Sequence, residues 1–267
     1  MAISYLKPTP LRKIDAKPSR GALHALRILE SFDAANPEQT LARISLRLKI
    51  PKATALRTLR ALEQMRYVFY DVHEEIYTLS AGVLTLAQRF LSRYETLTVA
   101  RPLLADLANE TGETAHFGAL QEGEVVYLEI AESPQRIRAY VLRGDRLPAH
   151  CVAAGKAILA HAAAPIVEAV LDAGLARVST ATITSRAAFL RELHTTKQRG
   201  YALNIGEWMP DVTGVSAPVF GPSGIVEGAM GVAGPISRLN ARNAHRVGRI
   251  VRQYAERLSA KLRTGRA

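Results

Sequence analysis

Six basic side chains share one stretch of the sequence with no acidic residue. They lie between Gln39 and Leu62, and they are Arg43, Arg47, Lys49, Lys52, Arg57 and Arg60. A helix that merely faces water usually carries glutamates as well, because i,i+4 pairs with lysine or arginine favour solubility. Cations without acids instead predict contact with a polyanion that attracts them electrostatically.

The segment IPKATALRTLRAL, residues 50–62, orders these cations on one side of a predicted helix. Helical spacing gathers on one side the apolar residues of an expected buried face: Ala55, Leu56, Leu59 and Leu62. The other side combines cations with residues that permit close approach: Ala53, Thr54, Arg57, Arg60, Ala61 and Gln64. This face, on the second of two helices joined by a tight break, predicts a helix-turn-helix that enters the DNA major groove.

The elements that must position this helix lie on both sides of it. Ser19 caps a predicted helix that runs to about Ala35, and a second helix covers about 41–48. Pro51 suits the first position of the third helix, where a missing N–H costs little. Strand-like runs at 67–70 and 76–79 predict a hairpin around the polar turn DVHEE. We therefore expect a winged helix-turn-helix over residues 20–79, after a flexible basic arm at 1–19. The alternative is a small helical bundle with an incidental basic face.

The geometry of DNA grooves assigns candidate roles to these side chains. Arg57 and Arg60 are candidates for bidentate contacts with guanine edges, and which of the two reads a base rather than a phosphate stays open. The hydroxyls and the remaining cations are expected to contact phosphates, while the alanine lets the backbone approach. The candidate DNA-binding residues are Thr40, Arg43, Lys52, Ala53, Thr54, Arg57, Thr58 and Arg60.

The second part of the chain changes from helix to strand. A linker helix is predicted within 80–98, at about 81–94, and its wide apolar face indicates a dimer seam. A helix at about 99–111 then precedes three strand candidates, TAHFGAL, EVVYLEIAES and RIRAYVLRG. Helices at about 165–173 and 185–199, further strands after Gly200 and a final helix at about 240–262 follow. This order predicts an α+β domain over residues 99–267, with an antiparallel sheet flanked by helices.

Small residues begin one of these helices, in the segment PAHCVAAGKA, residues 148–157. Free N–H groups at a helix start suit a carboxylate. The segment is not a nucleotide phosphate loop, because GxxxxGK[ST] does not allow His150 or Ala157 at their positions. Cys151 and His150 are neighbours without a third group to orient them, so no catalytic pair is expected. No metal, no cofactor and no enzymatic activity are expected either, since no residue spacing is typical of zinc.

Net charge is distributed unevenly along the 267 residues. Residues 1–70 carry 13 lysines and arginines against 5 acids, a net charge of +8, whereas residues 96–237 carry 11 against 14, a net charge of −3. This asymmetry predicts an anionic partner for the front of the chain only. A single cysteine cannot form an intrachain disulfide and fits a reducing compartment. We expect neither a secretory signal nor a membrane span, and therefore a cytoplasmic protein with no membrane partner.

Five segments together resemble the IclR family of bacterial transcriptional regulators over residues 20–262. They are IPKATALRTLRALE (50–63), LPAHCVAAGKAILA (147–160), GYALNIGE (200–207), GVSAPVF (214–220) and GVAGPISR (231–238). The resemblance implies a DNA-binding repressor or activator whose GAF-like C-terminal domain senses a small metabolite, often a carboxylate. It also implies a homodimer or a dimer of dimers. The family often has glycine where this chain has Lys49 and Arg66, at positions that favour a left-handed backbone.

The same resemblance implies an effector pocket between the helix start at 148–157 and the strands that begin at Gly214 and end at Ala233. The candidate effector-binding residues are Cys151, Ala154, Gly155, Asn204, Glu207, Ser216, Ala217 and Gly231. Trp208 either covers the ligand or packs on a dimer partner, and both interpretations stay open.

The expected function is ligand-responsive binding to double-stranded operator DNA, which controls catabolic genes in response to a small organic acid. One alternative is a constitutive DNA-binding protein whose C-terminal domain serves only oligomerisation. Another is an enzyme with an appended basic domain.

Overall fold

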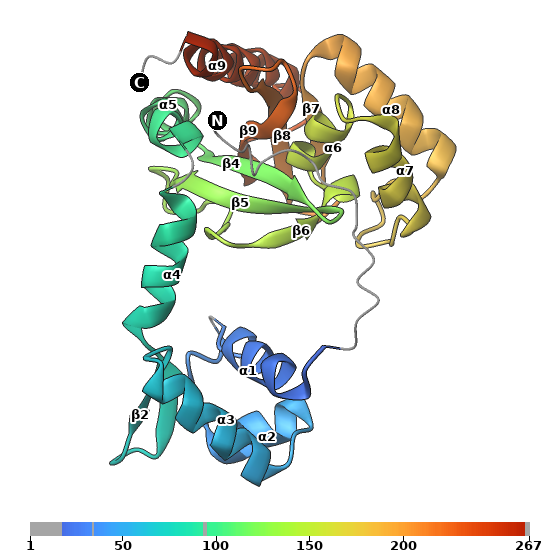
Figure 1. Cartoon of the computed structure of the whole chain (residues 1–267). Helices are drawn as coiled ribbons and strands as arrows, with labels where there is room; N and C mark the ends of the chain where they lie inside the picture. Colours follow the sequence, from blue (N-terminus) through green and yellow to red (C-terminus); the bar gives the residue numbers. More distant parts are fainter. Residues whose placement is uncertain (1–17, 34, 93–94, 265–267) are drawn as a thin grey trace. The chain divides into compact units, whose positions relative to one another are not determined.

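The computed structural model describes residues 18–33, 35–92 and 95–264. These residues divide into two compact units, one up to residue 92 and one from Glu95 onward (Figure 1). Among the described helices, none combines the length and the apolar character that crossing a membrane requires.

Three helices and a three-stranded sheet form the N-terminal unit. The helices are α1 (Arg20–Glu30), α2 (Leu41–Leu48) and α3 (Lys52–Gln64), and α4 (Ala81–Leu91) follows the sheet. Strands β2 (Val68–Asp71) and β3 (Ile76–Leu79) form the hairpin, and β1 (Glu38–Thr40) pairs antiparallel with β3. Apolar side chains of all three helices meet those of the hairpin in one core: Ile28, Phe32, Ile44, Leu59, Leu62, Val68 and Tyr77. The predicted winged helix-turn-helix is confirmed.

Two local predictions in this unit are corrected. The first helix ends at Glu30 rather than near Ala35, because the Asp33 carboxylate accepts the Ala35 N–H at 3.0 Å and thereby forms a turn. Strand β1 was not among the predicted elements, since its three polar residues show no strand periodicity. Its middle residue, Gln39, is buried and donates from its amide to the Ser31 carbonyl at 2.9 Å, which holds the strand in place.

Lys49 and Arg66 adopt the left-handed backbone conformation that glycine usually provides. Lys49 ends α2 with φ 53° and ψ 45°, and its N–H donates to the Leu46 carbonyl at 3.3 Å. Arg66 has φ 60° between α3 and β2, and its carbonyl accepts the Gly82 N–H of α4 at 3.0 Å. The turns are therefore kept without glycine, at a cost of roughly 1–2 kcal/mol for each side chain in this conformation.

A six-stranded antiparallel sheet forms the centre of the C-terminal unit, in the order β6-β5-β4-β9-β8-β7. The strands are β4 (Thr114–Gln121), β5 (Glu124–Ala131), β6 (Arg146–Pro148), β7 (Ala202–Ile205), β8 (Val212–Phe220) and β9 (Val226–Pro235). The register pairs Gly231 with His116 on one side and with Ser216 on the other. Residues more than a hundred positions apart in the sequence thus lie side by side on three neighbouring strands.

Helices cover both faces of this sheet (Figure 1). Helices α5 (Glu95–Thr111) and α9 (Ala244–Thr264) pack against each other and against one face. The short 3-10 helix η1 (Ala149–Cys151) and α6 (Ala153–Leu159) cover the other face. Helices α7 (Ala164–Asp172) and α8 (Arg186–Arg199) lie on the outer side of α6. The predicted α+β fold is confirmed.

The third strand candidate, RIRAYVLRG at 136–144, is wrong. This segment has no regular structure, and the shorter β6 pairs with β5 instead. Ile137 and Tyr140 face solvent, while the Arg143 guanidinium donates to the Glu129 carboxylate at 2.6 Å. The alternation of charged and apolar residues therefore belongs to a loop anchored by an ion pair, not to a strand.

Helix boundaries differ from the expected ones at two places. Pro102 does not restart a helix at 99: it lies inside α5, which begins at Glu95, and the preceding helix ends at Leu91. The last helix begins at Ala244 rather than near 240, because the Asn240 N–H donates to the Asn243 side chain at 2.9 Å and forms a turn first.

Replacing Arg66 by glycine should stabilise the N-terminal unit. Glycine adopts positive φ without strain, so the free energy of unfolding should rise by roughly 0.5–1 kcal/mol, after part of the gain is lost to unfolded-state entropy. Urea unfolding of the full chain measures this change. The matched control is Arg89→Gly, in the helical backbone of α4, which should lower stability by about 1 kcal/mol. Destabilisation by both substitutions would contradict the expectation.

Candidate functional site

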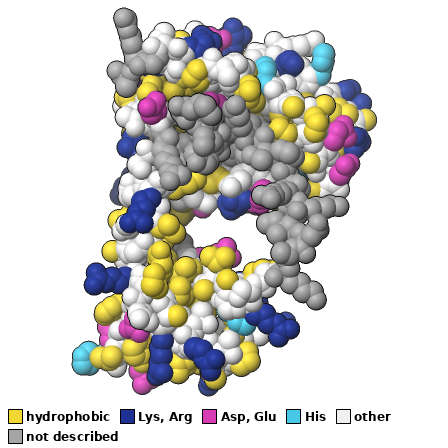
Figure 2. Space-filling view, in the orientation of Figure 1, with side chains coloured by type: hydrophobic (Ala, Val, Ile, Leu, Met, Phe, Trp, Pro, Cys, Tyr) yellow, Lys and Arg dark blue, Asp and Glu magenta, His cyan; other side chains and the backbone are white. Residues whose placement is uncertain are grey.

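Helix α3 presents its cations to solvent. Ala55, Leu59 and Leu62 are buried in the core, whereas Arg57 and Arg60 on the opposite side are exposed. Lys52 and Ala53 are exposed at the start of the same helix, and Thr54 is half-buried. Figure 2 shows Lys and Arg side chains at the surface of the N-terminal unit. The structure thus brings four of the eight candidate DNA-binding residues, Ala53, Thr54, Arg57 and Arg60, together on one helix face, with Lys52 at the start of the helix.

The other three candidates differ in how available their polar groups are. Thr40 is the N-cap of α2, and its hydroxyl accepts the Arg43 N–H at 3.2 Å. The Arg43 side chain is exposed and donates to the Asn36 side chain. The Thr58 hydroxyl donates to the Thr54 carbonyl at 2.9 Å, so it is already used within the helix.

Arg47 belongs to the fold rather than to this surface. Its guanidinium donates to the Ser31 carbonyl at 2.8 Å and to the Asp33 carboxylate at 2.7 Å. The hydrogen bond from Arg47 lowers the pKa of Asp33 to about 2. One cation of the acid-free stretch therefore pairs with an acid outside the stretch, and among the described residues no such ion pair is found for the other five.

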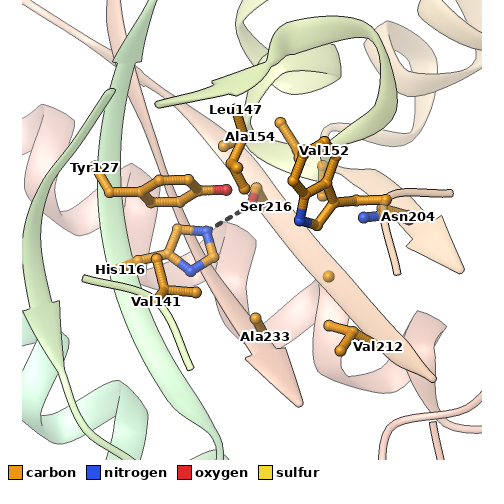
Figure 3. A pocket seen from close by; sticks show the side chains of 13 residues that line it. His116, Tyr127, Val141, Leu147, Val152, Ala154, Asn204, Val212, Ser216 and Ala233 are labelled. Carbon is orange, nitrogen blue, oxygen red and sulfur yellow. Dashed lines mark hydrogen bonds between the residues drawn. The ribbon is translucent and has the colours of Figure 1, made fainter. Parts of the chain in front are cut away.

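A small cavity lies between α6 and the concave side of the sheet (Figure 3). Its volume is about 40 Å³, and β4, β5, β8 and β9 supply part of the wall. Thirteen residues line it: His116, Tyr127, Val141, Leu147, Val152, Ala153, Ala154, Asn204, Trp208, Val212, Gly214, Ser216 and Ala233. None of these carries a formal charge when His116 is neutral.

Three of the eight candidate effector-binding residues line this cavity: Ala154, Asn204 and Ser216. The Asn204 side-chain oxygen accepts the Glu207 N–H at 2.8 Å, which leaves the amide N–H₂ as its remaining donor group. Among the described residues, no partner of this N–H₂ group or of the Ala153 and Ala154 backbone N–H groups is found. The wall therefore offers neutral hydrogen-bond donors.

Four other candidates lie behind the wall. Cys151 is in the core, where burial raises the pKa of its thiol to about 12. A Cβ on Gly155 would lie 2.1 Å from the Ala149 carbonyl oxygen, so this glycine lets η1 pack on α6. Ala217 is buried and does not line the cavity, although its neighbour Ser216 on β8 does. A Cβ on Gly231 would lie 2.1 Å from the Ser216 hydroxyl oxygen and 2.8 Å from His116 Nε2.

The eighth candidate, Glu207, forms a buried ion pair. Its carboxylate lies 2.5 Å from Lys156 Nζ of α6, and Lys156 is 1% exposed. Burial raises the pKa of Glu207, although the neighbouring ammonium opposes this shift. Hydroxyls of Ser179 and Thr182 donate to the Glu207 carbonyl, at 3.2 and 2.7 Å. The loop between β7 and β8 is thereby attached to α6.

His116 and Ser216 form a polar pair on the cavity wall. His116 Nε2 lies 3.2 Å from the Ser216 hydroxyl, and the ring packs edge-to-face on Tyr127 at 5.0 Å between centroids. Burial lowers the pKa of His116 to about 4, so the ring is neutral near pH 7. No periodicity in the sequence singles out His116 or Tyr127, because both lie in strands buried on both faces.

A second, larger cavity adjoins the first. Its volume is about 320 Å³, and it shares four lining residues with the smaller one: Val141, Leu147, Trp208 and Val212. The charged residues in its wall, Asp145 and Arg146, already have partners: Asp145 accepts the Leu142 N–H at 2.8 Å and Arg146 pairs with Glu124 at 2.8 Å. Trp208 thus forms part of the boundary between the two cavities.

The described part of the chain holds no cluster of three His, Cys, Asp or Glu side chains that suits a metal ion. His150 does not face a thiolate: its Nε2 lies 2.9 Å from the Ala176 carbonyl. The chemistry of both cavities is hydrogen bonding and apolar contact.

Comparison with known proteins gives consistent similarities over most of the chain. A family model described as bacterial transcriptional regulator IclR C-terminal matches residues 88–260, and the IclR helix-turn-helix domain matches residues 21–72. The regulator BhcR of Paracoccus denitrificans is 31% identical over 90% of this chain and 87% of its own length. The repressor AllR of Escherichia coli K12 is 24% identical over 96% of this chain and 95% of its own.

Solved structures show the same fold. An IclR transcriptional regulator from Alicyclobacillus acidocaldarius has a TM-score of 0.80 at 28% identity and covers 91% of this chain and 99% of its own. An IclR homolog from Microbacterium hydrocarbonoxydans, complexed with 4-hydroxybenzoate, has a TM-score of 0.79 at 25% identity and covers the same shares.

Stability should fall in acid because of His116. Above pH 6.5 the imidazole is neutral in the folded and in the unfolded chain. Below pH 6.5 the unfolded chain binds a proton at His116, whereas the folded chain binds it only near pH 4, because burial lowers the pKa there. The free energy of unfolding should therefore drop by roughly 3 kcal/mol across this range. His116→Phe should flatten this part of the stability curve, measured by urea unfolding between pH 7 and pH 4. His73→Phe, at an exposed hairpin position, is the control that should keep the wild-type slope. Equal slopes in all three proteins would contradict the assignment.

Proposed function

This chain belongs to the IclR family of bacterial transcriptional regulators, and from that premise we propose that α3 reads an operator while the cavity beside α6 binds a small organic acid. The family consists of DNA-binding regulators, not enzymes. The observation that carries the proposal is the exposed, acid-free face of α3 on a winged helix-turn-helix.

For DNA recognition, the long side chains of α3 are assigned to bases and the remaining groups to phosphates. Arg57 and Arg60 are exposed one helical turn apart, which suits the major groove of duplex DNA. Lys52 and Thr54 at the start of α3, with Thr40 and Arg43 at the start of α2, contact phosphates. Ala53 lets the backbone approach, and Thr58 supports the helix through its bond to Thr54.

For effector binding, the neutral donors of the cavity wall take a carboxylate. Ser216, the Asn204 amide and the N–H groups at the start of α6 lie around one space, and hydrogen bonds to an anion favour its charged form. The relative from Microbacterium hydrocarbonoxydans is complexed with an aromatic acid, which supports this class of ligand. Cys151, Gly155, Glu207, Ala217 and Gly231 act on the ligand indirectly, because they shape or hold this wall.

The chain works in the cytoplasm as a homodimer or a dimer of dimers. Helix α4 has no buried residue, and Leu84 and Leu86 on it are 62% and 56% exposed. Exposed apolar side chains of this kind on a helix are stabilised by contact with a second copy. Two DNA-binding units in one dimer bind two half-sites, and a ligand that prefers one arrangement of them changes operator affinity. The regulated genes are catabolic.

A protein that binds DNA constitutively and uses its C-terminal unit only for assembly is not favoured. Such a protein needs no cavity with an unpaired polar group in its wall, whereas this unit holds one, where His116 Nδ1 has no partner among the described residues. A ligand bound to a relative of the same fold argues in the same direction.

Arg57→Ala should weaken operator binding strongly. Loss of a bidentate base contact costs about 1–3 kcal/mol, or roughly ten- to a hundredfold in affinity. The affinity should be measured by fluorescence anisotropy of the full chain with DNA from the region upstream of its own gene, at several salt concentrations. Wild type should show a steep salt dependence. Arg191→Ala, an equal charge change at an exposed position of α8, should have little effect. Unchanged affinity of the Arg57 variant would contradict the assignment of α3.

A bound acid should both stabilise the protein and change the emission of Trp208, the sole tryptophan. At a hundredfold excess over Kd, one ligand adds about 2.7 kcal/mol to the free energy of unfolding. Thermal unfolding and tryptophan fluorescence of the full chain, titrated with a panel of organic acids, measure both effects. Stabilisation without a change in emission would place the ligand away from the cavity, and no stabilisation by any acid would exclude this class.

A further inference from the structure

We propose that His116 sets the specificity of the effector cavity, and that the effector is an acid that also carries a neutral hydrogen-bond donor, a hydroxyl or an amide N–H, directed at His116 Nδ1. This inference rests on the proposed function, because it narrows the class of acid that the same cavity accepts.

The first observation is an unpaired atom on the wall. His116 is 3% exposed, and its Nδ1 is buried without a hydrogen-bond partner among the described residues. Buried polar groups are paired in the great majority of cases, so an unpaired one in a cavity wall indicates a missing ligand group. In Figure 3 the ring directs Nε2 toward Ser216 and Nδ1 away from it, on the side where Val141 and Ala233 also line the cavity.

The second observation is the contact between His116 and Ser216, which is built into the sheet. The register pairs both residues with Gly231, and any side chain there would collide with the Ser216 hydroxyl and with His116 Nε2. The 3.2 Å contact between these two groups therefore depends on a position without a Cβ. Such a pair holds both polar groups in fixed places.

When an acid accepts the hydrogen of the Ser216 hydroxyl, the pair also fixes which nitrogen of His116 carries the proton. A neutral imidazole has one N–H donor and one acceptor nitrogen, and a hydroxyl has a single hydrogen to donate. If Ser216 donates its hydrogen to a carboxylate, its oxygen accepts the proton of His116 Nε2. Nδ1 is then the acceptor. The wall thus presents two groups to the ligand. The Ser216 hydroxyl donates to the acid, and Nδ1 of the His116 ring accepts a hydrogen bond from a donor on the ligand.

Charge excludes the other obvious class, a dicarboxylate. No lysine, arginine, aspartate or glutamate lines the smaller cavity, and burial keeps His116 neutral. A second carboxylate would meet the lone pair of Nδ1 and the π face or edge of Tyr127 without a cation to balance it. A hydroxyl or an amide N–H satisfies Nδ1 without adding charge. Hydroxy acids and amido acids fit, and simple acids leave Nδ1 unpaired.

Matched ligands test this inference on the full chain. The probes are two pairs of acids that differ by one hydroxyl, 4-hydroxybenzoate with benzoate and lactate with propanoate, titrated by calorimetry at pH 7. In wild type, the hydroxylated member of at least one pair should bind about tenfold tighter or more. His116→Phe should reduce this preference to within about twofold, whereas His116→Gln, which keeps an acceptor, should restore part of it.

A half-buried histidine outside the cavity supplies the control variant. His161 also has an unpaired ring nitrogen and packs edge-to-face on an aromatic ring, Phe220, but it does not line the cavity. His161→Phe should keep the wild-type preference. NMR of ring-¹⁵N histidine on the wild-type chain with a bound acid gives a measurement that needs no variant, since His116 should then show the Nε2–H tautomer at pH 7.

The outcomes distinguish the role of His116 from the broader proposal that the cavity binds an organic acid. Acid binding with no preference for the hydroxyl, or with a preference that His116→Phe leaves unchanged, overturns the role of His116 and leaves the effector site intact. An Nδ1–H tautomer overturns it as well. Failure of all four acids to bind overturns the organic-acid effector together with this inference.

Discussion

One buried ion pair determines the shape of the cavity. Lys156 extends from α6, Glu207 from the loop after β7, and the two meet almost without access to water. Removal of one partner of such a pair typically costs about 3–5 kcal/mol, because it leaves an unbalanced buried charge. The Glu207 backbone N–H in turn holds the Asn204 oxygen, and the next residue is Trp208. This ion pair, together with the Ser179 and Thr182 hydroxyls that donate to the Glu207 carbonyl, therefore holds the helix, the loop, the amide donor and the indole in place.

The basic charge of the N-terminal unit serves two separate purposes. Arg47 is used inside the unit, where it connects α2 to the end of α1 through Ser31 and Asp33. Arg57 and Arg60 stay at the surface of α3, and no ion pair of either is found in the part of the chain that the structure describes. The absence of glutamates between Gln39 and Leu62 thus marks a binding surface as a whole, but it does not assign each cation. Only contacts to residues outside the stretch distinguish the structural arginine from the others.

The fold was largely predictable, and the cavity was predictable only in part. Helices with a clear apolar period and the hairpin at DVHEE follow from local pattern. The strand prediction at 136–144 is wrong because an ion pair with Glu129 anchors this segment as a loop, and no local pattern reveals that contact. Asn204 and Ser216 were found through resemblance. His116 and Tyr127 were missed, since a strand buried on both faces shows no alternation that separates a cavity wall from a core. Cys151 and Gly155 are also candidates in the sequence, but in the structure they pack against other residues. Small residues at a helix start serve packing as readily as binding, so their type does not distinguish the two roles.

The burial of Cys151 has a practical consequence for work on this regulator. Thiol reagents and oxidants attack the thiolate, and this thiol is fully buried, hydrogen-bonded to the Pro148 carbonyl and raised in pKa. It is also the only cysteine in the sequence. The Cys151 thiol of the native protein should therefore not react with peroxide or with maleimides. A cysteine introduced at the surface would be the one site that takes a spin label or a fluorophore, with no need for a cysteine-free background.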